Sequence, residues 1–164
     1  MAAIILRGQG PKEAIMSVLR LVDRESITVP PQTTAKAAIQ LMLDRRVGSV
    51  VVVEERKVLG IFTERDVLRK LALSGRDPAQ IPVSELMTAP VKTVDPKADP
   101  TDALATMLEH HFRHLPVVDD RGRLRGVLSI RNLLQEMMEK YRHQLHTLEQ
   151  YVISEEPGAT KARG

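Results

Sequence analysis

Cysteine and tryptophan are absent from this 164-residue chain, and phenylalanine and tyrosine occur only twice each. The lack of cysteine excludes a disulfide framework, cysteine-ligated metal sites and thiol catalysis. It also fits a reducing compartment, and we expect a cytoplasmic protein. With so few rings, the core must be built from aliphatic side chains and methionine, and unstacked nucleic-acid bases would find few platforms.

Long hydrophobic runs and a dominant charge are also missing. No apolar stretch approaches the length of a membrane span, and no basic region precedes the short apolar stretch at the N-terminus, so neither a membrane span nor a signal peptide is expected. The 24 basic and 21 acidic residues give a net charge of +3 and are interspersed along the chain. Nucleic-acid binding needs a concentrated basic surface, so we expect neither a nucleic acid nor a membrane as partner.

The feature that organises the chain is an internal repeat. Residues 26–68 align with residues 91–134 at an offset of 65, so that Pro31 matches Pro96 and Met42 matches Met107. One extra residue in the second copy raises the offset to 66, which then aligns Gly60 with Gly126. A fixed offset over some forty positions indicates a duplication.

Each copy predicts the same order of elements, β-α-β-β-α. Short extended segments (27–29 and 91–94) precede amphipathic helices, and the second helix begins with Asp99 as N-cap and Pro100 at its first position. Its expected inward-facing residues are Ala103, Met107 and Leu108. Two strands follow, and a last helix begins at Thr63 or Ser129. We therefore predict an α/β (α+β) fold in which two copies pack as one pseudo-twofold unit, because one copy alone buries too little core.

The chain outside the two copies divides by composition. Residues 73–86 contain Ser-Gly and two prolines and are typical of a linker. The expected division is an N-terminal segment (1–14), a first copy (15–72), the linker (73–86), a second copy (87–141), a helical extension (142–153) and a disordered tail (154–164).

A hydrophobic stripe runs along the predicted C-terminal helix with alternating spacings of three and four residues, as in a coiled coil. We interpret it as a contact with a partner helix, which predicts a homodimer. The alternative is an amphipathic helix that folds back on its own domain. The stripe consists of Leu134, Met138, Tyr141, Leu145, Leu148 and Val152.

Two Ser/Thr-x-x-Asp/Asn elements stand where the last helix of each copy begins. Thr63 and Asp66 can form a capping box, in which the hydroxyl and the carboxylate each accept a backbone N–H. A carboxylate is also a natural acceptor for the vicinal hydroxyls of ribose. In the second copy Ser129 is retained but Asn132 replaces the acid, and an amide has only one accepting oxygen. The histidines lack the convergent spacing of a metal site, so no metal is expected.

The motifs GIFTERD, GVLSIRN, VGSVVVV, FRHLPVVDD and MTAPVKTV together resemble the CBS-domain family, named after cystathionine β-synthase. The resemblance covers about residues 18–141 and is nearest to short bacterial proteins that consist of one CBS pair, a Bateman module. Each motif is weak alone, but their duplicated order is specific.

The resemblance implies that Thr63 and Asp66 bind ribose in a cleft completed by the pre-strand position of the other copy. That position holds Arg113 and His114, and Arg131 is a further candidate, similar to the basic residues that hold phosphate in the gamma subunit of AMP-activated protein kinase. Adenine would be held around Ile61 and Lys92, although Lys92 could equally be a solvated lysine at a strand edge. A weaker second cleft would combine Ser129, Asn132 and Ser49.

These features predict a non-catalytic regulatory module that requires no cofactor and binds AMP, ADP or ATP, with AMP the expected ligand. A homodimer and an unidentified regulated protein are the expected partners. The alternatives are a structural or adaptor dimerisation protein with vestigial clefts, or a sensor of NAD or S-adenosylmethionine.

Overall fold

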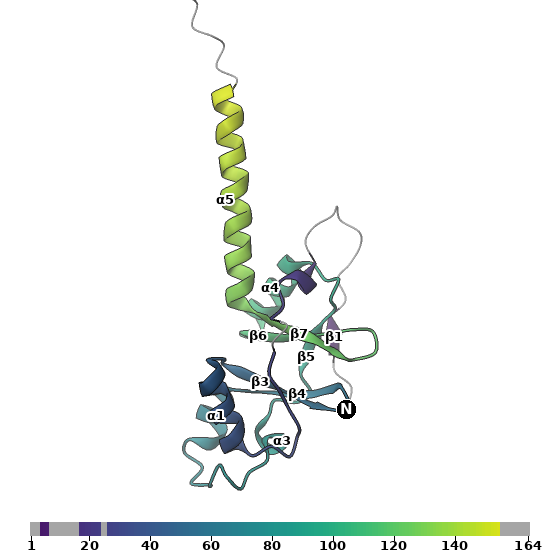
Figure 1. The fold of residues 1–164 in the computed structure, drawn as a ribbon, viewed down its shortest axis with the longest axis vertical. Helices are drawn as coiled ribbons and strands as arrows, with labels where there is room; N and C mark the ends of the chain where they lie inside the picture. Colours follow the sequence, from purple (N-terminus) through teal and green to yellow (C-terminus); the bar gives the residue numbers. More distant parts are fainter. Residues whose placement is uncertain (1–3, 7–16, 24–25, 155–164) are drawn as a thin grey trace, which may run out of the picture.

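The computed structural model describes residues 4–6, 17–23 and 26–154, which form two β-sheets with flanking helices (Figure 1). One sheet has three strands in the order β2-β3-β4, and the other has four in the order β1-β5-β6-β7. The tail predicted to be disordered lies outside the described residues from position 155 onward. Most of the segment 1–14 lies outside them as well.

Both copies show the predicted order of elements. The first comprises β2 (Thr28–Val29), α1 (Ala35–Arg45), β3 (Ser49–Glu54), β4 (Lys57–Thr63), the short helix α2 (Glu64–Asp66) and the π-helical turn η2 (Val67–Leu71). The second comprises β5 (Lys92–Val94), α4 (Pro100–Glu109), β6 (His114–Val118), β7 (Leu124–Ser129) and α5 (Ile130–Ser154).

The strand register repeats with the sequence. In the antiparallel β3–β4 pair Gly60 faces Val52, and in the β6–β7 pair the equivalent Gly126 faces Val117. Each glycine lets another segment approach closely, since a Cβ at Gly60 would lie 2.8 Å from the Thr88 carbonyl oxygen and one at Gly126 would lie 2.8 Å from the Asp23 carbonyl oxygen. The duplication is therefore preserved down to equivalent backbone contacts.

Local chemistry explains how α4 begins. Asp99 caps it by accepting the Thr101 N–H at 2.7 Å, and Pro100 occupies the first turn as predicted. The prediction that Leu108 faces inward is wrong, because it is 57% exposed. Successive residues of a helix are rotated by 100°, so Leu108 lies about a quarter turn from the centre of the buried face of α4. Leu104, which is nearer to that centre, packs against the core instead.

Each copy's core contains a segment from the other copy's start. Val18 to Leu21, around the 3-10 helix η1 (Val18–Arg20), packs into the core of the second copy with Met107 and Leu128. Conversely, α3 (Val83–Leu86) packs into the core of the first copy with Phe62. The latter half of the predicted linker 73–86 is thus helical and buried, while Leu73 is almost fully exposed.

A third cluster joins the two sheets. It places Val51, Val58 and Ile61 of the first copy against Val91, Val118 and Val127 of the second. Two equivalent bridges flank it, Ile61 with Thr88 and Val127 with Asp23. The prediction of one pseudo-twofold unit is confirmed.

Two features at the chain ends complete the fold. Strand β1 (Ile4–Leu6) pairs in parallel with β5 and aligns Ile4 with Lys92. Strand β5 therefore lies between β1 and β6, and Lys92 pairs with β1 while β6 pairs with β5 at Val94.

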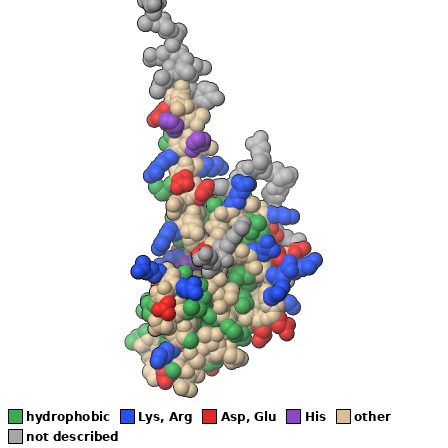
Figure 2. Space-filling view, viewed as in Figure 1, with side chains coloured by type: hydrophobic (Ala, Val, Ile, Leu, Met, Phe, Trp, Pro, Cys, Tyr) green, Lys and Arg blue, Asp and Glu red, His purple; other side chains and the backbone are tan. Residues whose placement is uncertain are grey.

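Helix α5 is continuous for 25 residues and projects away from the body (Figures 1 and 2). It starts in the core, where Leu133 is fully buried, and its first turns contact α4. The described side chains of its hydrophobic stripe are 46% to 61% exposed, and the Val152 side chain lies outside the described ones. The described part of the helix does not fold back on its own domain.

Candidate functional site

The first part of the site is the capping box where β4 passes into α2. The Thr63 hydroxyl accepts the Asp66 N–H at 3.2 Å, and Asp66 Oδ2 accepts the Thr63 N–H at 3.0 Å. The Thr63 hydroxyl also donates to Asp66 Oδ2 at 2.7 Å. The capping box thus fixes the carboxylate just beyond the end of β4, and this box is the one that the sequence predicted.

The other oxygen of Asp66 has two partners from outside the motif. Oδ1 accepts the Thr88 hydroxyl at 3.0 Å and forms an ion pair with Lys70 Nζ at 2.8 Å. Asp66 is only 6% exposed, and this burial acts to raise its pKa. Hydrogen bonds from Lys70, Thr63 and Thr88, with the charge of Lys70, outweigh burial and hold the pKa below its usual value. Asp66 is therefore an ionised buried acceptor.

The second part of the site lies around His114, which begins β6. A Cβ at Gly48 would lie 3.2 Å from His114 Cε1 and 3.3 Å from Glu64 Oε2, so Gly48 lies against both side chains. Glu64 also donates its N–H to the Gly48 carbonyl oxygen at 3.1 Å. His114 of the second copy and Glu64, which follows Thr63 in the first copy, therefore lie close together at the junction between the copies.

Cationic side chains surround this junction. Burial lowers the pKa of His114, the charges of Arg113 and Arg131 lower it further, and Glu64 partly opposes them. The imidazole is therefore mostly neutral at pH 7. The resemblance assigned Arg113, His114 and Arg131 to phosphate. In the structure the charges of both arginines act on His114, beside Glu64 of the first copy.

The two residues expected around adenine differ in position. Ile61 is buried, and its backbone exchanges hydrogen bonds with Thr88 at 3.2 and 2.8 Å. Lys92 instead directs its amine to His110 Nε2, at 2.5 Å, near the end of α4. Thr88 therefore links Ile61 to Asp66, through its backbone and its hydroxyl respectively. The described contact of Lys92 is with His110 and not with these residues.

The residues predicted for the second cleft have half of the equivalent capping arrangement. Ser129 Oγ accepts the Asn132 N–H at 3.1 Å. Across the strands of their own copies, Ser129 faces His114, just as Ser49 faces Thr63. His114 therefore lies where the two predicted clefts approach each other, rather than wholly within one.

Sequence reasoning missed Glu64, Lys70 and Thr88. Lys70 follows Asp66 by four residues, a spacing that favours an ion pair on a helix, so the sequence held a signal for it. Thr88 reaches Asp66 only because its backbone pairs with Ile61, and this long-range register has no local signature.

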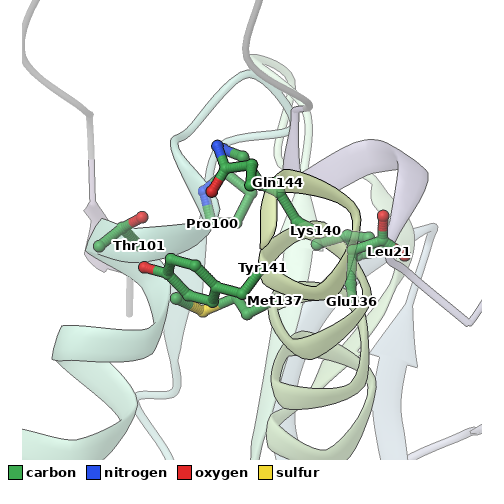
Figure 3. Close-up of a pocket in the computed structure, with 8 residues that line it drawn as sticks. All are labelled: Leu21, Pro100, Thr101, Glu136, Met137, Lys140, Tyr141 and Gln144. Carbon is green, nitrogen blue, oxygen red and sulfur yellow. The ribbon is translucent and has the colours of Figure 1, made fainter. Parts of the chain in front are cut away.

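A pocket of about 170 Å³ lies apart from these residues, between α5, the start of α4 and Leu21 (Figure 3). Tyr141 extends from α5 across it toward Thr101, and Lys140 and Glu136 come from the same helix. None of the predicted ligand residues lines it. Within the described part of the chain, no cluster of three His, Asp or Glu side chains is arranged to hold a metal, and no helix has the length and apolarity of a membrane span.

The fold and the duplicated motifs define a CBS-pair module. The CBS domain family matches residues 18–73 and 83–139, and the chain belongs to this family.

Individual proteins that are similar to this chain are also CBS-domain proteins. The CBS domain-containing protein YhcV of Bacillus subtilis is 34% identical over 122 residues, which cover 74% of this chain and 86% of YhcV. The crystal structure of the CBS-domain containing protein ATU1752 from Agrobacterium tumefaciens is 32% identical, with a TM-score of 0.68 over 74% of this chain and 99% of that one. The structure of CBSX2, a protein of Arabidopsis thaliana, in complex with AMP is 25% identical, with a TM-score of 0.66 over 76% and 98% of the two chains.

Proposed function

We propose that this CBS pair is a non-catalytic regulatory module of the cytoplasm that binds an adenine nucleotide, with AMP as the main ligand and ADP and ATP as competitors. The observation that carries the proposal is Asp66, a buried and ionised carboxylate positioned by a capping box at the junction of the two copies. A carboxylate of this kind suits the two hydroxyls of ribose, and it is the acid of the family's ribose motif.

Phosphate would be held by the second copy. Arg113 and Arg131 supply positive charge, and His114 supplies an N–H donor. Guanidinium groups are well suited to phosphate because they donate in a planar fork. Adenine would lie along the backbone of Ile61 and Thr88, in an apolar setting. We leave Lys92 out of the adenine contacts, because His110 already engages its amine.

The AMP complex of CBSX2 supports the class of ligand. The clefts should be unequal, since only the first has an acid in its ribose motif and the second has Asn132. Binding would change the relative stability of two arrangements of the copies, which a regulated partner could then recognise.

The experiment is a calorimetric titration with AMP and with adenosine. Asp66→Asn keeps the size of the side chain but removes its charge, and it should weaken both ligands about tenfold or more, because a hydrogen bond to a charged group contributes roughly 1.5–3 kcal/mol. Arg113→Ala should weaken AMP but leave adenosine almost unchanged. Asp102→Asn, an exposed acid on α4, is the matched control.

Equal AMP affinity in wild type and Asp66→Asn would contradict the ribose assignment. Absence of any binding at millimolar ligand would favour the second candidate, an adaptor that dimerises and has vestigial clefts. The exposed stripe on α5 supports the dimerisation that this candidate requires. A homodimer is compatible with both functions.

A further inference from the structure

Lys70 has all three of its amine hydrogens engaged at the ribose motif. Its Nζ lies 2.8 Å from Asp66 Oδ1, and it donates to the carbonyl oxygens of Leu86 and Met87 at 2.6 and 3.1 Å. An ammonium group has three donors and no acceptor, so these contacts use its full capacity. Lys70 thereby links the ribose-motif acid to the end of α3.

Asp66 is equally saturated. A carboxylate offers about four lone-pair positions. Two on Oδ2 accept from the Thr63 N–H and hydroxyl, and two on Oδ1 accept from the Thr88 hydroxyl and Lys70. The two hydroxyls of a ribose would need acceptor positions that are already occupied.

The four groups that donate to Asp66 differ in how easily a ribose hydroxyl can replace them. The Thr63 N–H belongs to the helix cap and stays. The Thr63 and Thr88 hydroxyls can rotate and still accept a hydrogen bond from the sugar. Lys70 can only donate, and its side chain is 38% exposed, so it is the group that can leave Oδ1 and retain solvation.

We propose that Lys70 is a latch that occupies the ribose acceptor Asp66 and is displaced when ribose binds. This inference rests on the proposed nucleotide function and adds to it a route for the signal. Displacement removes the Lys70 contacts from Leu86 and Met87, and so loosens the end of α3 just before Thr88 and β5. Occupancy of the cleft is thereby coupled to the segment that joins the two copies.

The second copy lacks this device. The residue equivalent to Lys70 is Glu136, 66 positions further on, and the equivalent of Asp66 is Asn132. Glu136 instead lines the pocket beside Leu21, which is itself the equivalent of Leu86 (Figure 3). The latch is thus a property of the first copy alone.

The test compares Lys70→Met with Arg69→Met in the full chain. Arg69 is the exposed neighbour on the same turn, so its substitution loses the same charge without touching Asp66. Lys70→Met should bind both AMP and adenosine about threefold more tightly than Arg69→Met, because a partly exposed ion pair no longer competes with the ribose. The gain must appear with adenosine, since it arises at the sugar and not at the phosphate.

Hydrogen exchange supplies a second readout. The Met87 N–H, bonded to the Val83 carbonyl oxygen at 2.7 Å, reports on the end of α3. Saturating AMP should speed its exchange in the wild type, and Lys70→Met should exchange fast without ligand and show no further change.

The outcomes separate the latch from the proposed function. If wild type binds AMP through Asp66 but Lys70→Met shows equal or weaker affinity than Arg69→Met, the latch is overturned and the function stands. If AMP and adenosine bind to none of the proteins, the proposed function fails and the latch fails with it.

Discussion

His114 is a residue whose surroundings determine its ionisation. Burial of the imidazole, together with the charges of Arg113 and Arg131, holds its pKa below the ordinary value of 6.5, against the opposing charge of Glu64. In the unfolded chain this group takes up a proton at a higher pH than in the folded protein. Below pH 6.5 the unfolded state therefore binds more protons, and the free energy of unfolding falls as the pH falls.

We predict that the wild type loses more stability than His114→Asn between pH 7.5 and pH 5.5. The stability that neutral His114 provides is complete above pH 6.5 and is lost progressively below it. Asp66 does not contribute in this window, because its lowered pKa affects stability only below about 3.8. Urea midpoints at the two pH values measure the difference, with His143→Asn on exposed α5 as control. An equal loss in wild type and His114→Asn would show that other groups dominate.

The predictability of single residues depended on how local their contacts are. The capping box of Thr63 and Asp66 followed from four consecutive residues, and the structure shows both of its hydrogen bonds. The saturation of Asp66 by Thr88 and Lys70 did not follow, because Thr88 arrives through pairing with a distant strand. The expected role of Lys92 came from the resemblance alone, and its contact with His110 depends on how β5 packs against α4.

At the scale of elements, α5 carries more apolar residues at heptad spacing than its own domain buries. Its first turns bury Leu133, yet the stripe from Leu134 to Leu148 remains exposed on a helix that leaves the body. In the space-filling view this helix carries charged and histidine side chains around its apolar residues (Figure 2). An exposed heptad stripe on a long helix is typical of helix pairing.

We predict that Leu145→Lys with Leu148→Lys weakens a homodimer by about a hundredfold or more, since burial of each leucine contributes roughly 1.5–3 kcal/mol. Light scattering over a concentration series measures the dissociation constant. Gln144→Lys with Thr147→Lys adds the same charge to exposed positions beside the stripe and should have a smaller effect. A monomeric wild type, or a dimer that the leucine changes leave intact, would contradict the partner-helix interpretation.

Elements with strong periodicity were predictable, and those that depend on tertiary pairing were not. The helices α1 and α4 and both hairpins followed from hydrophobic pattern and turn residues. Strand β1 has only three residues and is held by pairing with β5. The helix α3 has four residues within a segment rich in turn signals, and its burial against Phe62 comes from the first copy's core.

At the scale of the whole molecule, the two copies exchange their first segments. The core of the first copy includes Ile81, Val83 and Leu86, and the core of the second includes Val18, Leu21 and Val22. The connection between them passes through the exposed region around Gly75, where an added Cβ would have no atom of a non-adjacent residue within 4 Å. The copies are therefore held together by packing in both directions, in addition to the chain itself.

We predict that cutting this connection leaves the molecule assembled. A protease site inserted at Gly75 should be cleaved readily, and the two fragments should then co-elute on a sizing column and separate only in denaturant. The reason is that each fragment carries buried residues of the other's core. A cut inserted at Gln144 on α5, made in the variant that carries Leu145→Lys and Leu148→Lys, is the control. It should release the C-terminal piece, because Leu145 and Leu148 are exposed and do not pack against the body. Separation of the Gly75 fragments in native buffer would contradict the exchanged packing.

The exchange of segments also bears on how such a chain arose. A polypeptide with one copy alone would lack three residues of its core, and a second identical molecule could supply them by donating its own first segment. The present molecule then has the arrangement of a symmetric dimer of single motifs that are joined in one chain. Fusion turns an encounter between two molecules into an intramolecular contact at high effective concentration. It also frees the two halves to diverge, and Asp66 and Lys70 in one half now correspond to Asn132 and Glu136 in the other.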